Sequence, residues 1–143
     1  MLEKRTLCHC EVEVDQAATR KWYEQAKEWG CECGDCLNFV EVAKQRLLPQ
    51  ATLDILDSLG IPPEKATYVC HLTDEGGMHL YELSYRVAGS ILHDPFRDRI
   101  PIVVETGHCY HEMYPYGAPD FPQPHFDLGF SAKLPWVLET PRE

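Results

Sequence analysis

The sequence predicts a single α+β domain over residues 1–143. It is expected to have three N-terminal helices, including an αα-hairpin, packed on one face of a mostly antiparallel sheet. Three observations lead to this prediction. Apolar residues recur at helical spacing up to residue 60, they alternate at a period of two beyond residue 65, and no repeat or linker divides the chain. A chain of 143 residues with 44% hydrophobic content is long enough to bury one core.

A strand is expected first, over residues 6–14, because apolar and polar residues alternate there. Cys8 and Cys10 share the apolar face of this strand. Asp15 is then placed to cap a helix, and Gly30 is placed to end it. The apolar stripe of this helix is Ala18, Trp22, Ala26 and Trp29.

Two more helices follow. Residues 31–34 are expected to form a tight link to a second helix, which is capped by Asp35 and stops near Pro49. The core-facing residues of this second helix are Leu37, Phe39, Val40, Ala43 and Leu47. The third helix ends at Gly60, and its inward residues are Leu53, Leu56 and Leu59. The tight link between the first two helices predicts the αα-hairpin.

The period changes to two beyond residue 65, which is typical of strands. Residues 68–72 and 81–87 flank the turn sequence 74–77, Asp-Glu-Gly-Gly, and together they predict a β-hairpin. Gly89 is expected to be a bulge or the end of a strand.

The C-terminal part of the chain contributes two further strands. One is expected to begin at residues 102–104 and to run towards Tyr110, and the other covers residues 126–134. Between them, residues 114–124 are rich in proline and predict an extended loop. Acidic residues on these strands, Asp127 among them, are expected on solvated faces.

The charge balance excludes two classes of partner. The chain has 23 acidic and 13 basic residues, which gives a formal net charge of −10. Nucleic acids and anionic lipid surfaces bind basic faces, so neither is expected as a partner. No apolar run approaches the roughly 20 residues that span a bilayer, and the N-terminus shows no signal-peptide core. The expected location is therefore the cytoplasm.

Three of the seven cysteines form the strongest candidate site. Cys31, Cys33 and Cys36 follow a C-x-C-x2-C spacing that lets their sulfurs converge in a turn at the start of a helix. A closed tetrahedral zinc site needs a fourth ligand, and the first strand offers Cys10, with Cys8 and His9 as alternatives. The helix dipole favours thiolates at this position, which predicts that Cys36 is the most acidic of the three.

Two other interpretations of the same cysteines stay open. The thiols can be small buried residues that pack a tight turn, because unpaired cysteines are among the most buried residue types. Alternatively, Cys33 and Cys36 form the C-x-x-C pair of a dithiol oxidoreductase or serve a metal-dependent enzyme. The oxidoreductase interpretation is weakened because thioredoxin-like C-x-x-C pairs enter their helix from a strand, whereas this pair is expected to follow a helix.

Several blocks resemble a family of small bacterial proteins of uncharacterised function. The matching segments are residues 22–29, 31–39, 59–65, 80–89, 126–130 and 134–138, and they include a CxCxxCxNF segment and a C-terminal LPWVL segment. The resemblance spans most of the chain and implies the same order of elements, but no activity. Leu37 departs from it, because the family has a basic residue there, and Cys8 to Cys10 lie outside the shared pattern.

The sequence therefore predicts a non-enzymatic binding or interaction module that carries a possible structural zinc site. Its partner is an unidentified protein or small molecule. No catalytic residue is assigned, because phosphate-binding glycine loops, nucleophile elbows and H-E-x-x-H motifs are absent from the sequence.

Overall fold

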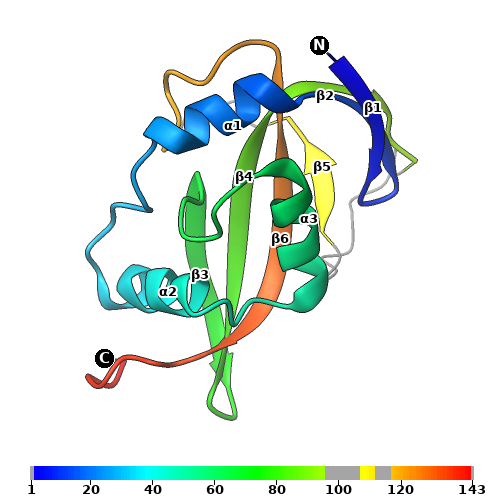
Figure 1. The fold of residues 1–143 in the computed structure, drawn as a ribbon. Coiled ribbons are helices and arrows are strands. Elements are labelled where there is room, and N and C mark those ends of the chain that lie inside the picture. The colour runs from blue at the N-terminus through cyan, green and yellow to red at the C-terminus, as the bar shows by residue number, and fades with distance from the viewer. Residues whose placement is uncertain (1, 96–106, 112–116, 143) are drawn as a thin grey trace.

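The structure, a computed structural model, describes residues 2–95, 107–111 and 117–142. In this part of the chain it contains three helices and a six-stranded sheet in which every pairing is antiparallel (Figure 1). In chain order the elements are β1 (Leu2–Leu7), β2 (Cys10–Asp15), α1 (Gln16–Gln25), α2 (Gly34–Lys44), α3 (Gln50–Leu59), β3 (Tyr68–Glu75), β4 (Met78–His93), β5 (His108–Tyr110) and β6 (His125–Pro135).

The long strand β4 is the centre of the sheet. Along one edge it pairs with β6, from Met78 opposite Pro135 to Ala88 opposite His125. Along its other edge β4 pairs first with β3 and then, from Gly89 onwards, with β2. The strand order is β1-β2-β4-β6-β5, with β3 added beside β4. Consequently, none of the described strands pairs with residues 85–88 on the edge that β2 and β3 share.

Helix α1 supplies the hydrogen bonds that a strand would otherwise make in this gap. The hydroxyl of Tyr23 donates to the Arg86 carbonyl at 2.6 Å, and the Ala88 N–H donates to the Thr19 hydroxyl at 3.1 Å. Both helical side chains are fully buried. Buried backbone groups of a strand need partners, so these two residues fix α1 across the sheet.

Gly89 is the residue at which β2 begins to pair with β4. A Cβ atom there would lie 1.9 Å from the Glu13 carbonyl oxygen, and the backbone adopts φ +144°. Only glycine allows this approach. The residue lies inside β4 and does not end the strand.

A buried ion pair joins the two central strands. Arg86 on β4 and Asp127 on β6 lie opposite each other, with 3.0 Å between Nε and Oδ1. Their side chains are only 4% and 2% exposed. The expectation that Asp127 lies on a solvated face is wrong, because both faces of β6 are covered over most of its length.

The predicted arrangement of the fold is wrong, although the broad α+β class fits. The sheet dominates, and a β-hairpin, rather than the single expected strand, precedes the helices. Figure 1 also shows α1 and α2 at opposite ends of the sheet, so they do not form an αα-hairpin. They are joined by residues 26–33, which contain no helix. Helix α1 ends at Gln25 because the backbone of Ala26 becomes extended, and Trp29 bonds instead to the Glu64 carbonyl at 3.0 Å.

The prediction of a single strand over residues 6–14 is also wrong, because two strands, β1 and β2, cover this part of the chain. Cys8 and His9 have φ values of 51° and 69° and form the two-residue turn between β1 and β2. Cys8 therefore leaves the face that carries the buried Cys10, Val12 and Val14. Positive φ is uncommon for residues other than glycine, which is why alternation alone did not reveal this turn.

Several local predictions are confirmed. Asp15 caps α1 by accepting the Ala18 N–H at 3.0 Å, and Gly60 ends α3 in the left-handed conformation. The inward face of α3 carries the predicted leucines Leu53, Leu56 and Leu59. The β3–β4 hairpin turns at Gly76 and Gly77.

Other local predictions fail or are not tested. Leu37 and Leu47 were expected in the core but are exposed, and α2 is capped at Cys33 rather than at Asp35. The start of the strand expected from residues 102–104 lies outside the described residues, and its end towards Tyr110 is β5. Among the helices described, none has the length and apolar character needed to cross a bilayer.

Replacement of Asp127 by Asn is expected to lower the free energy of unfolding by about 3–5 kcal/mol, because it leaves the buried Arg86 guanidinium without a counter-charge. Urea denaturation of both proteins measures this difference. The matched control is Asp57→Asn, which breaks an exposed pair with Arg46 and should cost no more than about 1 kcal/mol. Equal losses in the two variants would contradict the structural role of the buried pair.

Candidate metal centre

The structure brings Cys31, Cys33 and Cys36 together where the chain enters α2. Their sulfur atoms all lie within 4.8 Å of one another, and those of Cys31 and Cys33 are 3.4 Å apart. Cys33 is the N-cap of α2, and Cys36 lies in its first turn. Cys31 and Cys33 are exposed, whereas Cys36 is 7% exposed.

This spacing is compatible with a bound metal ion. Thiolates that share a tetrahedral zinc ion, with Zn–S bonds of about 2.3 Å, have their sulfurs about 3.8 Å apart. The 3.4 Å between the sulfurs of Cys31 and Cys33 lies just below that value, and the upper bound of 4.8 Å for the whole group lies about 1 Å above it. All seven cysteines of the chain are thiols, and none is paired in a disulfide.

Asn38 fixes the start of α2 against the sheet. Its side chain donates to the Pro135 carbonyl at 3.1 Å and accepts the Val137 N–H at 2.7 Å, and it is completely buried. One turn earlier, the Asp35 carbonyl accepts a hydrogen bond from the Tyr81 hydroxyl at 2.7 Å. The first turn of α2, and Cys36 with it, is thereby held by β4 and by the end of β6.

A charged pair borders the site. The guanidinium of Arg142 donates to the Asp35 carboxylate at 2.7 Å. The Asp35 carboxylate is thus paired with the Arg142 guanidinium, and it does not belong to the group formed by the three cysteines.

Cys31 and Cys36 differ in acidity. The pKa of Cys36 is raised to about 12, mainly by burial, with a lowering effect of the Trp29 side chain and smaller raising effects of the neighbouring Cys31 and Cys33. The pKa of Cys31 is lowered, first by the backbone N–H of Cys33 and then by the thiols of Cys36 and Cys33. The prediction that Cys36 is the most acidic is therefore wrong, because loss of hydration at this buried sulfur outweighs the helix dipole.

Trp29 provides a donor that is suited to a thiolate. Its indole Nε1 is buried and makes no hydrogen bond of normal geometry with any residue that the structure describes, yet it lies close enough to the Cys36 sulfur to lower the pKa of that thiol. A buried donor without a partner is costly. A negatively charged sulfur is a stronger acceptor than a thiol, so ionisation of Cys36 would satisfy this donor.

Cys10 does not join the group. It lies on β2, where its sulfur is 3.6 Å from Asp94 Oδ1 and burial raises its pKa. Cys8, in the β1–β2 turn, is hydrogen-bonded to Cys109. This turn and the start of α2 lie on opposite sides of the molecule in Figure 1. Among residues 2–95, 107–111 and 117–142, no histidine, cysteine or carboxylate completes the three-cysteine group as a fourth ligand.

Sequence analysis missed the roles of Asn38 and Trp29. Asn38 carries a signal in the sequence, because it is a polar residue among the apolar positions of α2. Trp29 was assigned to a helical stripe, and nothing in its spacing shows that its N–H lies near Cys36.

Comparisons with known proteins found no relative of this chain. No family model matches the chain, and no curated protein or solved structure matches it either. The resemblance to an uncharacterised bacterial family stays a prediction.

Alkylation should separate the three thiols in the metal-free protein. We expect iodoacetamide at pH 7.5 to modify Cys31 before Cys36, because the thiolate is the reacting species and Cys36 is both buried and protonated. Pulsed labelling followed by peptide mass spectrometry measures the order. Denatured protein is the control in which the rates should converge, and faster labelling of Cys36 in the folded protein would contradict the assigned pKa order.

Proposed function

We propose that this protein is a non-enzymatic metal-binding module that holds one zinc ion through Cys31, Cys33 and Cys36. The observation that carries the proposal is the convergence of three sulfurs within 4.8 Å of one another. Thiolates are strong zinc ligands, and three of them leave one tetrahedral position for an external group. That group would be water in the isolated protein and a donor atom from a partner in a complex.

The surroundings of the sulfurs support this proposal. Asn38 and Tyr81 hold the first turn of α2, so the ligand on the helix is fixed before metal binds. The indole N–H of Trp29 gains an acceptor when Cys36 ionises. The net charge of −10 also favours a cation over an anion as the ligand of the protein. The predicted cytoplasmic location would keep the thiols reduced.

Substitution of the cysteines tests the proposal directly. We expect the purified protein, reconstituted with zinc and then desalted, to hold about one zinc per chain. Cys36→Ser and Cys31→Ser should each lose most of the metal, because two thiolates and water form a much weaker site. Elemental analysis and native mass spectrometry measure the stoichiometry.

The matched control is Cys70→Ser, which removes a half-buried thiol on β3 that lies outside the group. Cys70→Ser should retain the metal. Loss of zinc in this control, or a parent protein that holds none after reconstitution, would overturn the proposal.

Zinc affinity should rise with pH. The pKa of Cys36 is raised to about 12 in the metal-free protein, so zinc must displace at least this proton at neutral pH. Between pH 6 and 8 the binding constant is therefore expected to increase by at least about ten-fold per pH unit. Competition with a chromophoric chelator at several pH values measures the slope. A binding constant independent of pH would show that the Cys36 thiolate is not a ligand.

A second candidate function rests on a different feature of the same residues. Cys33 is exposed at the helix N-cap, and the buried Cys36, with its raised pKa, follows one turn later. A dithiol oxidoreductase uses this combination: the exposed sulfur attacks a disulfide substrate and releases one substrate thiol, and the buried sulfur then attacks the exposed sulfur in the mixed disulfide and releases the second substrate thiol. The protein would become a disulfide while the substrate becomes two thiols. Chelator-reversible protection of the thiols supports zinc, and a two-electron redox titration of Cys33 and Cys36 supports this alternative.

A further inference from the structure

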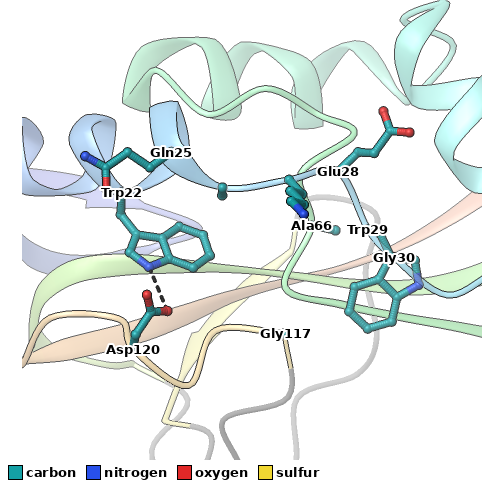
Figure 2. A pocket seen from close by; sticks show the side chains of 10 residues that line it. Trp22, Gln25, Glu28, Trp29, Gly30, Ala66, Gly117 and Asp120 are labelled. Atoms are coloured by element: carbon teal, nitrogen blue, oxygen red, sulfur yellow. Dashed lines mark hydrogen bonds between the residues drawn. The ribbon is translucent and has the colours of Figure 1, made fainter.

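A cavity with two tryptophans lies beside the metal centre. It has a volume of about 300 Å³ and is bounded by the end of α1, the extended segment after it, and the loop at residues 117–120. Trp22 and Trp29 stand on opposite sides of it in Figure 2. Ligand cavities in proteins start at about 300 Å³, so this one fits a small molecule or the headgroup of a larger one.

Trp22 is held rigidly at one side. Its indole N–H donates to Asp120 Oδ1 at 3.2 Å (Figure 2). Its ring centroid lies 4.9 Å from that of Tyr23 and 4.9 Å from that of Phe121. Because Tyr23 is itself fixed by its hydrogen bond to the Arg86 carbonyl, the Trp22 ring is already in position before any ligand enters.

Trp29 is fixed at the other side. Its backbone N–H bonds to the Glu64 carbonyl, and its ring meets the edge of Tyr68 at a centroid distance of 6.4 Å. A Cβ atom on Gly117 would lie 3.1 Å from the indole ring, so the loop contacts Trp29 directly. The two indoles are therefore supported by separate parts of the core.

The charges around the cavity favour a cation. Three charged residues line it, namely Lys27, Glu28 and Asp120. Glu28 is already paired with Lys44 at 2.8 Å. Asp120 is exposed and accepts the Trp22 N–H, and no described basic side chain forms an ion pair with it. Its carboxylate is thus available to a positive ligand, while Lys27 is a like charge that weakens such binding.

We propose that this cavity binds the headgroup of an organic ammonium cation, in particular a trimethylammonium group, between Trp22 and Trp29 and next to Asp120. The negative faces of aromatic rings attract cations, tryptophan most strongly, and quaternary ammonium ligands are recognised in this way. A methylated ammonium also has little need of hydrogen-bond donors or acceptors, which two indoles do not supply at their faces. The carboxylate of Asp120 adds attraction from one side.

This proposal does not depend on the metal. The cavity lining contains none of Cys31, Cys33 and Cys36, and the experiment is performed in the presence of a chelator. A failure to bind a cation would leave the zinc proposal untouched, and the reverse is equally true.

The probe is choline, and its control is 3,3-dimethylbutan-1-ol, which has the same shape without the charge. The chain contains three tryptophans, so a ¹H–¹⁵N spectrum shows three indole N–H signals, assigned by single Trp→Phe variants. Choline should shift the signals of Trp22 and Trp29 saturably and leave that of Trp136 unchanged. The neutral analogue should bind at least about ten-fold more weakly. Equal binding of the two probes would overturn the proposal, as would the absence of any shift.

Two variants test the role of charge. Asp120→Asn keeps an oxygen acceptor for the Trp22 N–H and removes only the charge, and we expect choline to bind about ten-fold more weakly. Lys27→Met should tighten binding by removing the like charge. Asp54→Asn is the control, because it removes the same charge from the exposed face of α3, and it should bind as the parent protein does. An effect of Asp54→Asn as large as that of Asp120→Asn would show that choline is attracted by the overall negative charge of the protein and not by Asp120 in particular. That result would overturn the assigned site.

Discussion

The pairing of β4 with β6 is the constraint on which the rest of the structure depends. It runs from Met78 to Ala88 along one edge of β4, and the buried Arg86–Asp127 pair lies within it. A one-residue shift of register would turn every side chain of β6 to the opposite face and separate these two charges. The other edge of β4 is shared by β3, which pairs with β4 up to Ser84, and β2, which pairs with it from Gly89, so a gap is left between them. Helix α1 is placed by that gap, and the first turn of α2 is placed by Tyr81 from β4 and by residues at the end of β6.

Those parts of the fold that depend on neighbours in sequence could be predicted. The β3–β4 hairpin has two glycines at its turn, α3 has a regular leucine stripe ending at Gly60, and β6 alternates along its length. The arrangement of the helices could not be predicted in this way. Trp29 follows Trp22 at a spacing that is typical of a helix. The same spacing also arises when the chain leaves the helix, becomes extended and brings the second tryptophan back to the core. Helix α1 ends at Gln25, and Trp29 is held instead by a long-range hydrogen bond to Glu64, which periodicity does not record.

The candidate site also has one part that depends on neighbours in sequence and another that depends on tertiary structure. The cysteines Cys31, Cys33 and Cys36 converge because they are close in sequence, so their spacing was sufficient to predict the group. Their relative acidity and the position of Cys10 depend on tertiary structure. Burial of Cys36 in the first turn of α2 reverses the order expected from the helix dipole, and β2 pairs with the end of β4 from Gly89 onwards, away from the start of α2 (Figure 1). Asn38 is a polar residue in an apolar stretch of α2, a pattern that could have indicated its buried contact, although the contact was not predicted.

Trp29 connects the two proposed sites through a single side chain. Its indole N–H lies near the Cys36 sulfur, and the same ring borders the cavity opposite Trp22. A zinc ion with three thiolates carries a net charge of −1 at the site, and an organic ammonium in the cavity would carry +1. The two proposed sites therefore share one side chain: an ionised Cys36 would accept the Trp29 N–H, and a cation in the cavity would be attracted to the face of the same ring. The extended segment after α1 places this ring where it reaches both sites.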